Sequence, residues 1–119
     1  MKSISSVLRV ESLGFFILSV WLYAVLQMSW WLFAVLLFIP DIFMVGYLKN
    51  ARLGARIYNI GHSYLTPLLV LFALWLFSSP ISLPIALIWL AHISMDRALG
   101  YGLKLETGFK DTHLGKIGK

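Results

Sequence analysis

Four ionisable side chains interrupt long apolar stretches of the sequence, and together we call them the His/Asp cluster: Asp41, His62, His92 and Asp96. Two imidazoles and two carboxylates form an N2O2 ligand set that suits Zn, Mn or Fe. His92 and Asp96 are four residues apart, so on a helix both face the same side and can hold one ion. Such an ion would offset the charge of two buried carboxylates and lower the pKa of a bound water. The first interpretation is therefore a metal site, with hydrolysis of a lipid or another amphiphile as its chemistry.

The same four residues allow two other interpretations. His92 with Asp96, and His62 with Asp41, could form hydrogen-bonded pairs that hold neighbouring helices together in a non-enzymatic membrane protein. The cluster could equally belong to a path for protons or ions in a small transport subunit, because ionisable groups within a membrane usually mark function. All three interpretations stay open on the sequence alone.

Five further polar residues are candidates for contacts with the site or with a substrate. Arg97 and Arg56 are candidates to hold a phosphate, because guanidinium groups bind phosphate through paired hydrogen bonds. Asn59 lies on the polar face of its predicted helix. Asp111 and His113 belong to the C-terminal tail, which either folds back to supply further ligands or stays solvated. No catalytic residue is assigned.

The cluster stands out because the rest of the chain is strongly apolar. Of 119 residues, 60% are hydrophobic and 13% are charged, there is no cysteine, and the mean hydropathy is +0.84. A soluble domain is about half apolar and about a quarter charged. A unit of this length also leaves about a third of its unfolded-chain surface exposed, so it has no means of burying this much apolar surface internally. The surrounding solvent must be lipid.

The apolar blocks predict an all-α polytopic membrane protein with one domain, 1–119, built as an antiparallel bundle of four transmembrane helices. The predicted spans are about 5–26, 30–49, 52–77 and 82–103, and a cytoplasmic tail follows at 104–119. A span needs roughly 20 residues. A three-span alternative reads the first apolar block as one long tilted helix. Gly46, Gly54 and Gly61 are expected to permit close helix packing.

The distribution of positive charge favours four spans. The formal net charge is +5, which in a soluble protein would suggest nucleic acid. With four spans, however, all ten Lys and Arg residues fall on one side, and the loops on the other side have none. Because basic residues accumulate in cytoplasmic segments, we expect a multi-pass protein of the inner membrane with both termini cytoplasmic. The expected partners are membrane lipids and not nucleic acid, and homo-oligomerisation stays open.

Several motifs resemble a small bacterial integral-membrane family, the domain of unknown function 4260. The resemblance covers nearly the whole chain and implies a four-helix membrane protein with one domain, without an activity to transfer. The motifs lie at 40–47 (PDIFMVGY), 58–62 (YNIGH), 91–104 (AHISMDRALGYGLK) and 107–115 (TGFKDTHLG).

A more distant resemblance concerns the order of the polar motifs. Pro40-Asp41, Gly61-His62-Ser63 and His92-x3-Asp96 follow one another as in membrane-bound metal-dependent hydrolases of the bacterial inner membrane. This similarity implies a metal-dependent hydrolytic activity.

Overall fold

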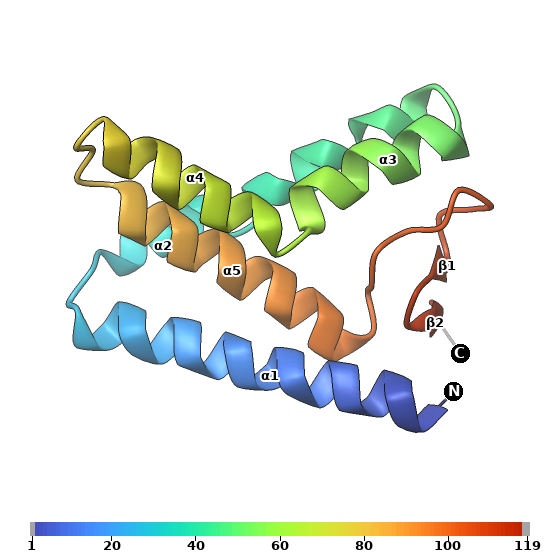
Figure 1. The fold of residues 1–119 in the computed structure, drawn as a ribbon, viewed down its shortest axis with the longest axis horizontal. Helices are drawn as coiled ribbons and strands as arrows, with labels where there is room; N and C mark the ends of the chain where they lie inside the picture. Colours follow the sequence, from blue (N-terminus) through green and yellow to red (C-terminus); the bar gives the residue numbers. More distant parts are fainter. Residues whose placement is uncertain (1, 118–119) are drawn as a thin grey trace.

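The structure of the chain, a computed structural model, describes residues 2–117. This part of the chain is mostly helical, with one short hairpin near its C-terminal end (Figure 1). The elements are α1 (Lys2–Val25), α2 (Trp30–Leu36), the 3-10 helix η1 (Ile39–Leu48), α3 (Ala51–His62), α4 (Leu65–Leu76), α5 (Ser82–Leu99), β1 (Asp111–Thr112) and β2 (Gly115–Lys116).

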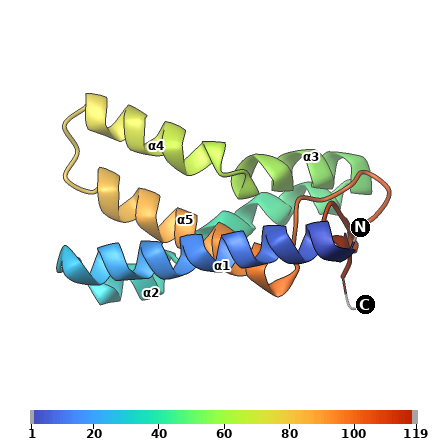
Figure 2. The same ribbon diagram turned by 60° about the horizontal axis from the view of Figure 1, so that its bottom comes forward.

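Helix α5 lies at the centre of the molecule. It packs against α1 along most of its length and against α4 on another side, while α2 contacts its first turns (Figures 1 and 2). Helix α3 packs mainly against η1, and this pair extends away from the other helices. The start of α1 and the hairpin lie at the same end of the molecule, and the turns that join α1 to α2 and α4 to α5 lie at the opposite end (Figure 1).

Small residues explain why α5 is so well buried. Ala86, Ala91 and Ser94 are buried on this helix, and small side chains let neighbouring helices approach closely in lipid. The Ser94 hydroxyl donates to the Leu90 carbonyl 2.7 Å away, so its polar group is satisfied within the helix. The helix ends at Gly100, whose φ of 99° is a left-handed conformation that glycine adopts without strain.

The outer helices expose apolar side chains over most of their surface. Trp21 on α1 and Leu68, Phe72 and Trp75 on α4 are each more than half exposed. In the described part of the chain, Ser3–Val25 and Trp30–Leu48 are long and apolar enough to cross a membrane. The bent pair α3 and α4 makes a third crossing if it counts as one span. Length and apolar surface therefore indicate a membrane protein with two or three candidate spans, whereas we had predicted four.

The second and third predicted spans are not continuous α-helices. The segment predicted at 30–49 ends its α-helix at Leu36 and resumes at Ile39 as a 3-10 helix with Pro40 in its first turn, because proline has no N–H to continue the α-helical pattern. The segment predicted at 52–77 breaks at Ser63, whose backbone is extended, and its two helices are bent by 55°. Each break adjoins a member of the His/Asp cluster.

Glycines allow η1 and α3 to cross at short range, as expected from the sequence. A Cβ atom at Gly46 would lie 2.8 Å from the Leu53 carbonyl oxygen. A Cβ atom at Gly54 or Gly61 would overlap the rings of Tyr47 or Phe43. The close crossing brings the start of η1 beside the end of α3.

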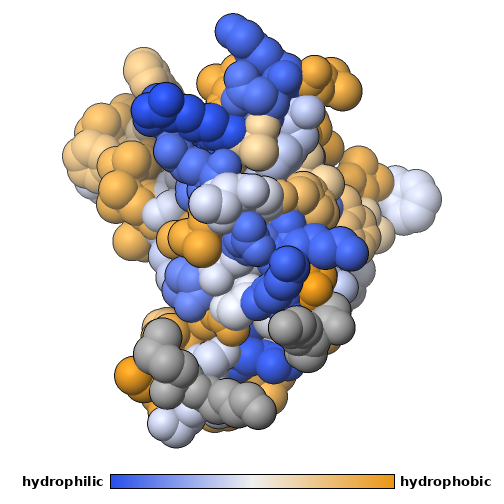
Figure 3. Space-filling model, turned by 90° about the vertical axis from the view of Figure 1, so that its right-hand side faces the viewer, coloured by the Kyte–Doolittle hydropathy of each residue, from blue (hydrophilic) through white to orange (hydrophobic). Residues whose placement is uncertain are grey.

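The C-terminal segment folds against α3. The Asn59 side chain donates to the Lys104 carbonyl (2.8 Å) and accepts from the Lys104 amide (2.6 Å), so one side chain replaces a strand partner. Strands β1 and β2 then pair as a short antiparallel hairpin. Figure 3 faces this end of the molecule, where hydrophilic residues gather beside apolar surface.

Candidate metal centre

The fold brings all four members of the His/Asp cluster together. Each offers one ligand atom, and these four atoms all lie within 4.8 Å of one another. Asp41 comes from η1, His62 is the last residue of α3, and His92 and Asp96 are one turn apart on α5. The site therefore depends on the glycine crossing of η1 with α3 and on the position of α5 beside it.

The ligand atoms lie about as close together as atoms that surround a single metal ion. Asp41 Oδ1 lies 3.2 Å from His62 Nε2 and 3.1 Å from His92 Nε2, and the two Nε2 atoms are 3.2 Å apart. Asp96 Oδ2 lies 3.2 Å from His92 Nε2 and 3.7 Å from His62 Nε2. Ligand atoms about 2.0–2.1 Å from one ion in tetrahedral geometry are about 3.3–3.4 Å apart. These five separations bracket that value, and the sixth pair, the Asp41 and Asp96 oxygens, lies within 4.8 Å.

The backbone fixes the tautomer of His62. Its Nδ1 lies 3.0 Å from the Tyr58 carbonyl oxygen, which can only accept, so Nδ1 carries a proton. A neutral His62 therefore turns the lone pair of Nε2 toward the cluster, as metal-binding histidines do. The Tyr58 ring also stacks on the imidazole, with centroids 3.8 Å apart and planes 5° from parallel. A hydrogen bond from His62 to Asp41 would instead require the imidazolium form.

Packing and its Nε2 contacts hold the second imidazole. His92 is 1% exposed, and the Phe38 ring meets it edge-on at a centroid distance of 5.9 Å. Its Nδ1 is buried and has no hydrogen-bond partner among the described residues. All the polar contacts of His92 therefore converge on Nε2, the atom that faces the rest of the cluster.

Burial is uneven across the cluster. The side chains of His62 and His92 are 4% and 1% exposed, that of Asp96 is 15% exposed, and that of Asp41 is 40% exposed. Buried carboxylates are costly unless they are paired or coordinate a cation. Asp41 is thus the accessible corner of an otherwise enclosed site.

The family of the chain is clear from its sequence. A family model described as a domain of unknown function, DUF4260, matches residues 5–117. The chain belongs to this family. No curated protein and no solved structure matches it. The DUF4260 domain extends from α1 to the tail and contains the complete His/Asp cluster.

The two candidate arginines occupy different environments in the DUF4260 domain. Arg97 donates to the His62 carbonyl (3.2 Å), and its guanidinium lies 4.2 Å from the Tyr64 ring centroid. Arg97 therefore contacts the backbone of a cluster residue. Arg56 is exposed and donates to Glu106 of the tail (2.7 Å). This ion pair lowers the pKa of the Glu106 carboxyl and joins α3 to the tail.

The other three candidates lie outside the cluster. Asn59 anchors the tail through Lys104. Asp111 accepts a hydrogen bond from Thr107 (2.7 Å), and His113 Nδ1 accepts one from the Leu103 amide (2.8 Å). Partial burial, with the nearby charge of Arg97, lowers the pKa of His113. The tail folds back as we considered, but Asp111 and His113 stabilise the tail itself.

Two contacts beside the cluster were not predicted from the sequence. Lys104 is only 4% exposed, and its ammonium lies 3.9 Å from the Phe109 ring centroid and 4.9 Å from that of Tyr58. Burial lowers the pKa of Lys104. Because Tyr58 also stacks on His62, one aromatic ring separates this buried lysine from the cluster. The spacing of Tyr58 and His62, one helical turn, was the available signal.

Proposed function

We propose that this DUF4260 protein is an integral membrane protein that binds one divalent ion, Zn²⁺, Mn²⁺ or Fe²⁺, in the His/Asp cluster. The observation that carries the proposal is the convergence of two imidazole nitrogens and two carboxylate oxygens within 4.8 Å of one another, with five of the six pairs at 3.1–3.7 Å. With His62 neutral, the two carboxylates leave a negative charge that a divalent cation balances. Because no thiolate is present, the ligand set favours ions that accept nitrogen and oxygen.

We further propose that the ion serves metal-dependent hydrolysis of a lipid or another amphiphile. Catalytic zinc sites keep one position accessible, and the exposure of Asp41 supports such a position here. A bound ion of this kind would polarise a substrate oxygen and lower the pKa of a coordinated water. All four residues of the cluster would hold the ion, with the accessible Asp41 on the side that the substrate approaches, and Arg97 would position His62 through its carbonyl.

Four membrane crossings, with both termini in the cytoplasm, are the topology that we propose for the inner membrane. Support comes from the start of α1 and the C-terminal hairpin, which lie at the same end of the molecule as α3 with its basic residues (Figure 1). The turns at the opposite end lack Lys and Arg. A reporter fused after Lys119 should read cytoplasmic, and a periplasmic signal would refute this topology.

Elemental analysis of the purified protein tests the metal proposal directly. The wild type should retain about one ion per chain, and His92→Ala should retain almost none, because ligand removal opens the polyhedron. His113→Ala is the matched control, since His113 bonds within the tail. A wild type free of metal, or a His92→Ala variant with full metal, would rule out the site.

A proton or ion path is the second candidate, because the contact of 3.2 Å between the two Nε2 atoms is also a hydrogen-bond length. This candidate predicts that Asp41→Asn and Asp96→Asn reduce proton flux into liposomes and leave the metal content unchanged. A purely structural cluster would instead lower the stability of both variants without a flux to lose.

A further inference from the structure

We propose that the cavity between α2, η1 and α5 binds the hydrocarbon chain of a phospholipid and holds the adjoining polar linkage at the His/Asp cluster. This inference rests on the proposed function, because it names the class of substrate that the same site would take. The cavity measures about 170 Å³. An apolar cavity of about 150 Å³ holds a hydrocarbon the size of benzene, so this cavity suits a segment of an alkyl chain.

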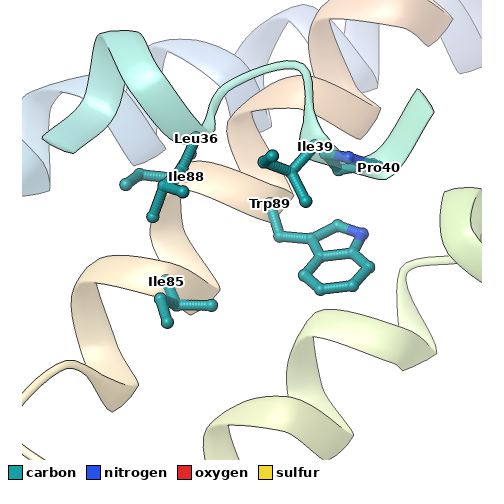
Figure 4. A pocket seen from close by; sticks show the side chains of 6 residues that line it. All are labelled: Leu36, Ile39, Pro40, Ile85, Ile88 and Trp89. Carbon is teal, nitrogen blue, oxygen red and sulfur yellow. The ribbon is translucent and has the colours of Figure 1, made fainter. Parts of the chain in front are cut away.

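The lining of the cavity is entirely apolar, apart from the indole nitrogen of Trp89. Figure 4 shows Pro40 and Trp89 toward one side of the cavity and Leu36 and Ile85 toward the other. The six lining residues are Leu36, Ile39, Pro40, Ile85, Ile88 and Trp89. A charged or strongly polar ligand would find no partner in such a lining, whereas an alkyl chain needs none.

The cavity adjoins the cluster through three separate elements. Pro40 immediately precedes Asp41 in η1. Ile88 lies one turn before His92 on the same face of α5. The Trp89 indole donates to the carbonyl of Gly61 (2.7 Å), the residue that directly precedes His62 in α3. Pro40, Ile88 and Trp89 therefore link the lining of the cavity to the cluster.

The surroundings of the cavity identify the occupant as lipid. Val35, Phe38 and Ile42 are close in the sequence to the lining residues of α2 and η1, each is more than half exposed, and all three belong to a candidate membrane span. The cavity thus adjoins a surface that faces hydrocarbon. Asp41, the accessible corner of the cluster, lies in the same span. A chain that enters from the bilayer would reach Asp41 with its polar linkage, and the remainder of the lipid would stay in the membrane.

A second cavity supplies the matched control. It measures about 300 Å³ between α1, α4 and α5 and includes Leu83, Leu87 and Leu90 in its lining. By helical spacing, these three residues lie on the face of α5 opposite Ile85, Ile88 and His92. The second cavity is equally apolar but does not adjoin the cluster. A substitution there changes a lipid-facing cavity and leaves the proposed chain site intact.

Photo-crosslinking tests the inference. The full chain, in nanodiscs with phosphatidylglycerol carrying a diazirine near the middle of one acyl chain, should be labelled in the α2–η1 segment more strongly than at exposed Phe72. Ile85→Trp fills the cavity and should reduce that labelling at least about fivefold, because the chain loses its space. Leu36→Trp is a second filling variant for the case in which Ile85→Trp does not fold. Leu83→Trp should leave the labelling unchanged.

Metal analysis of the same samples separates the two proposals. Ile85→Trp and Leu36→Trp should keep about one ion per chain, because neither residue is a ligand. Selective labelling in a wild type without metal would support the chain site and defeat the proposed function. Labelling of the α2–η1 segment no stronger than at Phe72, or unaffected by both filling variants, would overturn the chain site whatever the metal content.

Discussion

The half of the molecule around η1 and α3 differs in construction from the half formed by α1, α4 and α5. The second half consists of regular α-helices that expose apolar side chains and pack through small residues. The first half contains a 3-10 helix, a crossing on glycines, two interrupted helices and a polar tail. Irregular backbone is tolerated in a membrane only where protein or a cavity surrounds it.

The two halves bring their residues of the His/Asp cluster into place in different ways. On α5, a spacing of four residues is enough to align His92 with Asp96. Asp41 and His62 come from different segments, so the chain must bend at both places to bring them to α5. The irregular half thus supplies two residues of the cluster by changing the path of the backbone, and the regular half supplies two without any change.

The largest expected effect compares one ligand from each half. Asp96→Asn, which alters a buried ligand on α5, should weaken metal affinity about 100-fold, whereas Asp41→Asn should weaken it about tenfold, because the exposed Asp41 is more readily replaced by water. Titration against a chelator of known affinity measures both. Equal losses of metal affinity would mean that the buried Asp96 and the accessible Asp41 contribute equally to metal binding.

Glycine substitutions test the crossing itself. Gly54→Ala should destabilise the protein by about 2 kcal/mol, because the new methyl group overlaps the Tyr47 ring. Gly14→Ala is the control on α1, where a Cβ atom meets nothing within 4 Å, and it should stabilise by about 0.5–1 kcal/mol through helix propensity. Unfolding in detergent, followed by circular dichroism, gives both values. A neutral Gly54→Ala would show that the crossing has room to spare.

The polar anchor of the tail should have a smaller, local effect. Asn59→Ala removes both hydrogen bonds to the Lys104 backbone, which is worth about 1–2 kcal/mol of local stability. Hydrogen exchange at the Lys104 amide should accelerate about tenfold, since 1.4 kcal/mol is about a factor of ten. Exchange within α1 should not change. Unaltered exchange at Lys104 would assign the docking of the tail to its other contacts.

The smallest effect is the pH dependence of the tail. In the docked tail, the pKa of His113 is lowered from its ordinary value of 6.5. Between that lowered pKa and 6.5, the undocked tail binds more protons than the docked tail, so docking weakens as the pH falls through 6.5. Below the lowered pKa the loss is complete, since protonated Nδ1 no longer accepts from the Leu103 amide. An NMR titration of His113 should give a midpoint below 6.5. A midpoint above 6.5 would contradict the observed hydrogen bond.

The sequence was most informative where the chain is regular. The helices predicted at 5–26 and 82–103 correspond to α1 and most of α5, and of these two α1 is also a candidate membrane span. The cluster could also be predicted, since ionisable residues are conspicuous against apolar neighbours. The breaks at Ile39 and Ser63 were missed, because hydropathy does not report backbone direction. Asn59 was assigned to the polar face beside His62, but its bonds to Lys104 join residues too far apart for helical spacing to indicate.

The distribution of ligands along the chain has a consequence for how the protein is made. Asp41 leaves the ribosome first, His62 follows, and both partners on α5 arrive last. Until α5 has been inserted, Asp41 lacks two of its three neighbours in the cluster, His92 and Asp96. A carboxyl group without its partners is costly in apolar surroundings, so the early segments keep this cost until the final helix docks. The site is thus complete only after every segment that contributes to it has been inserted.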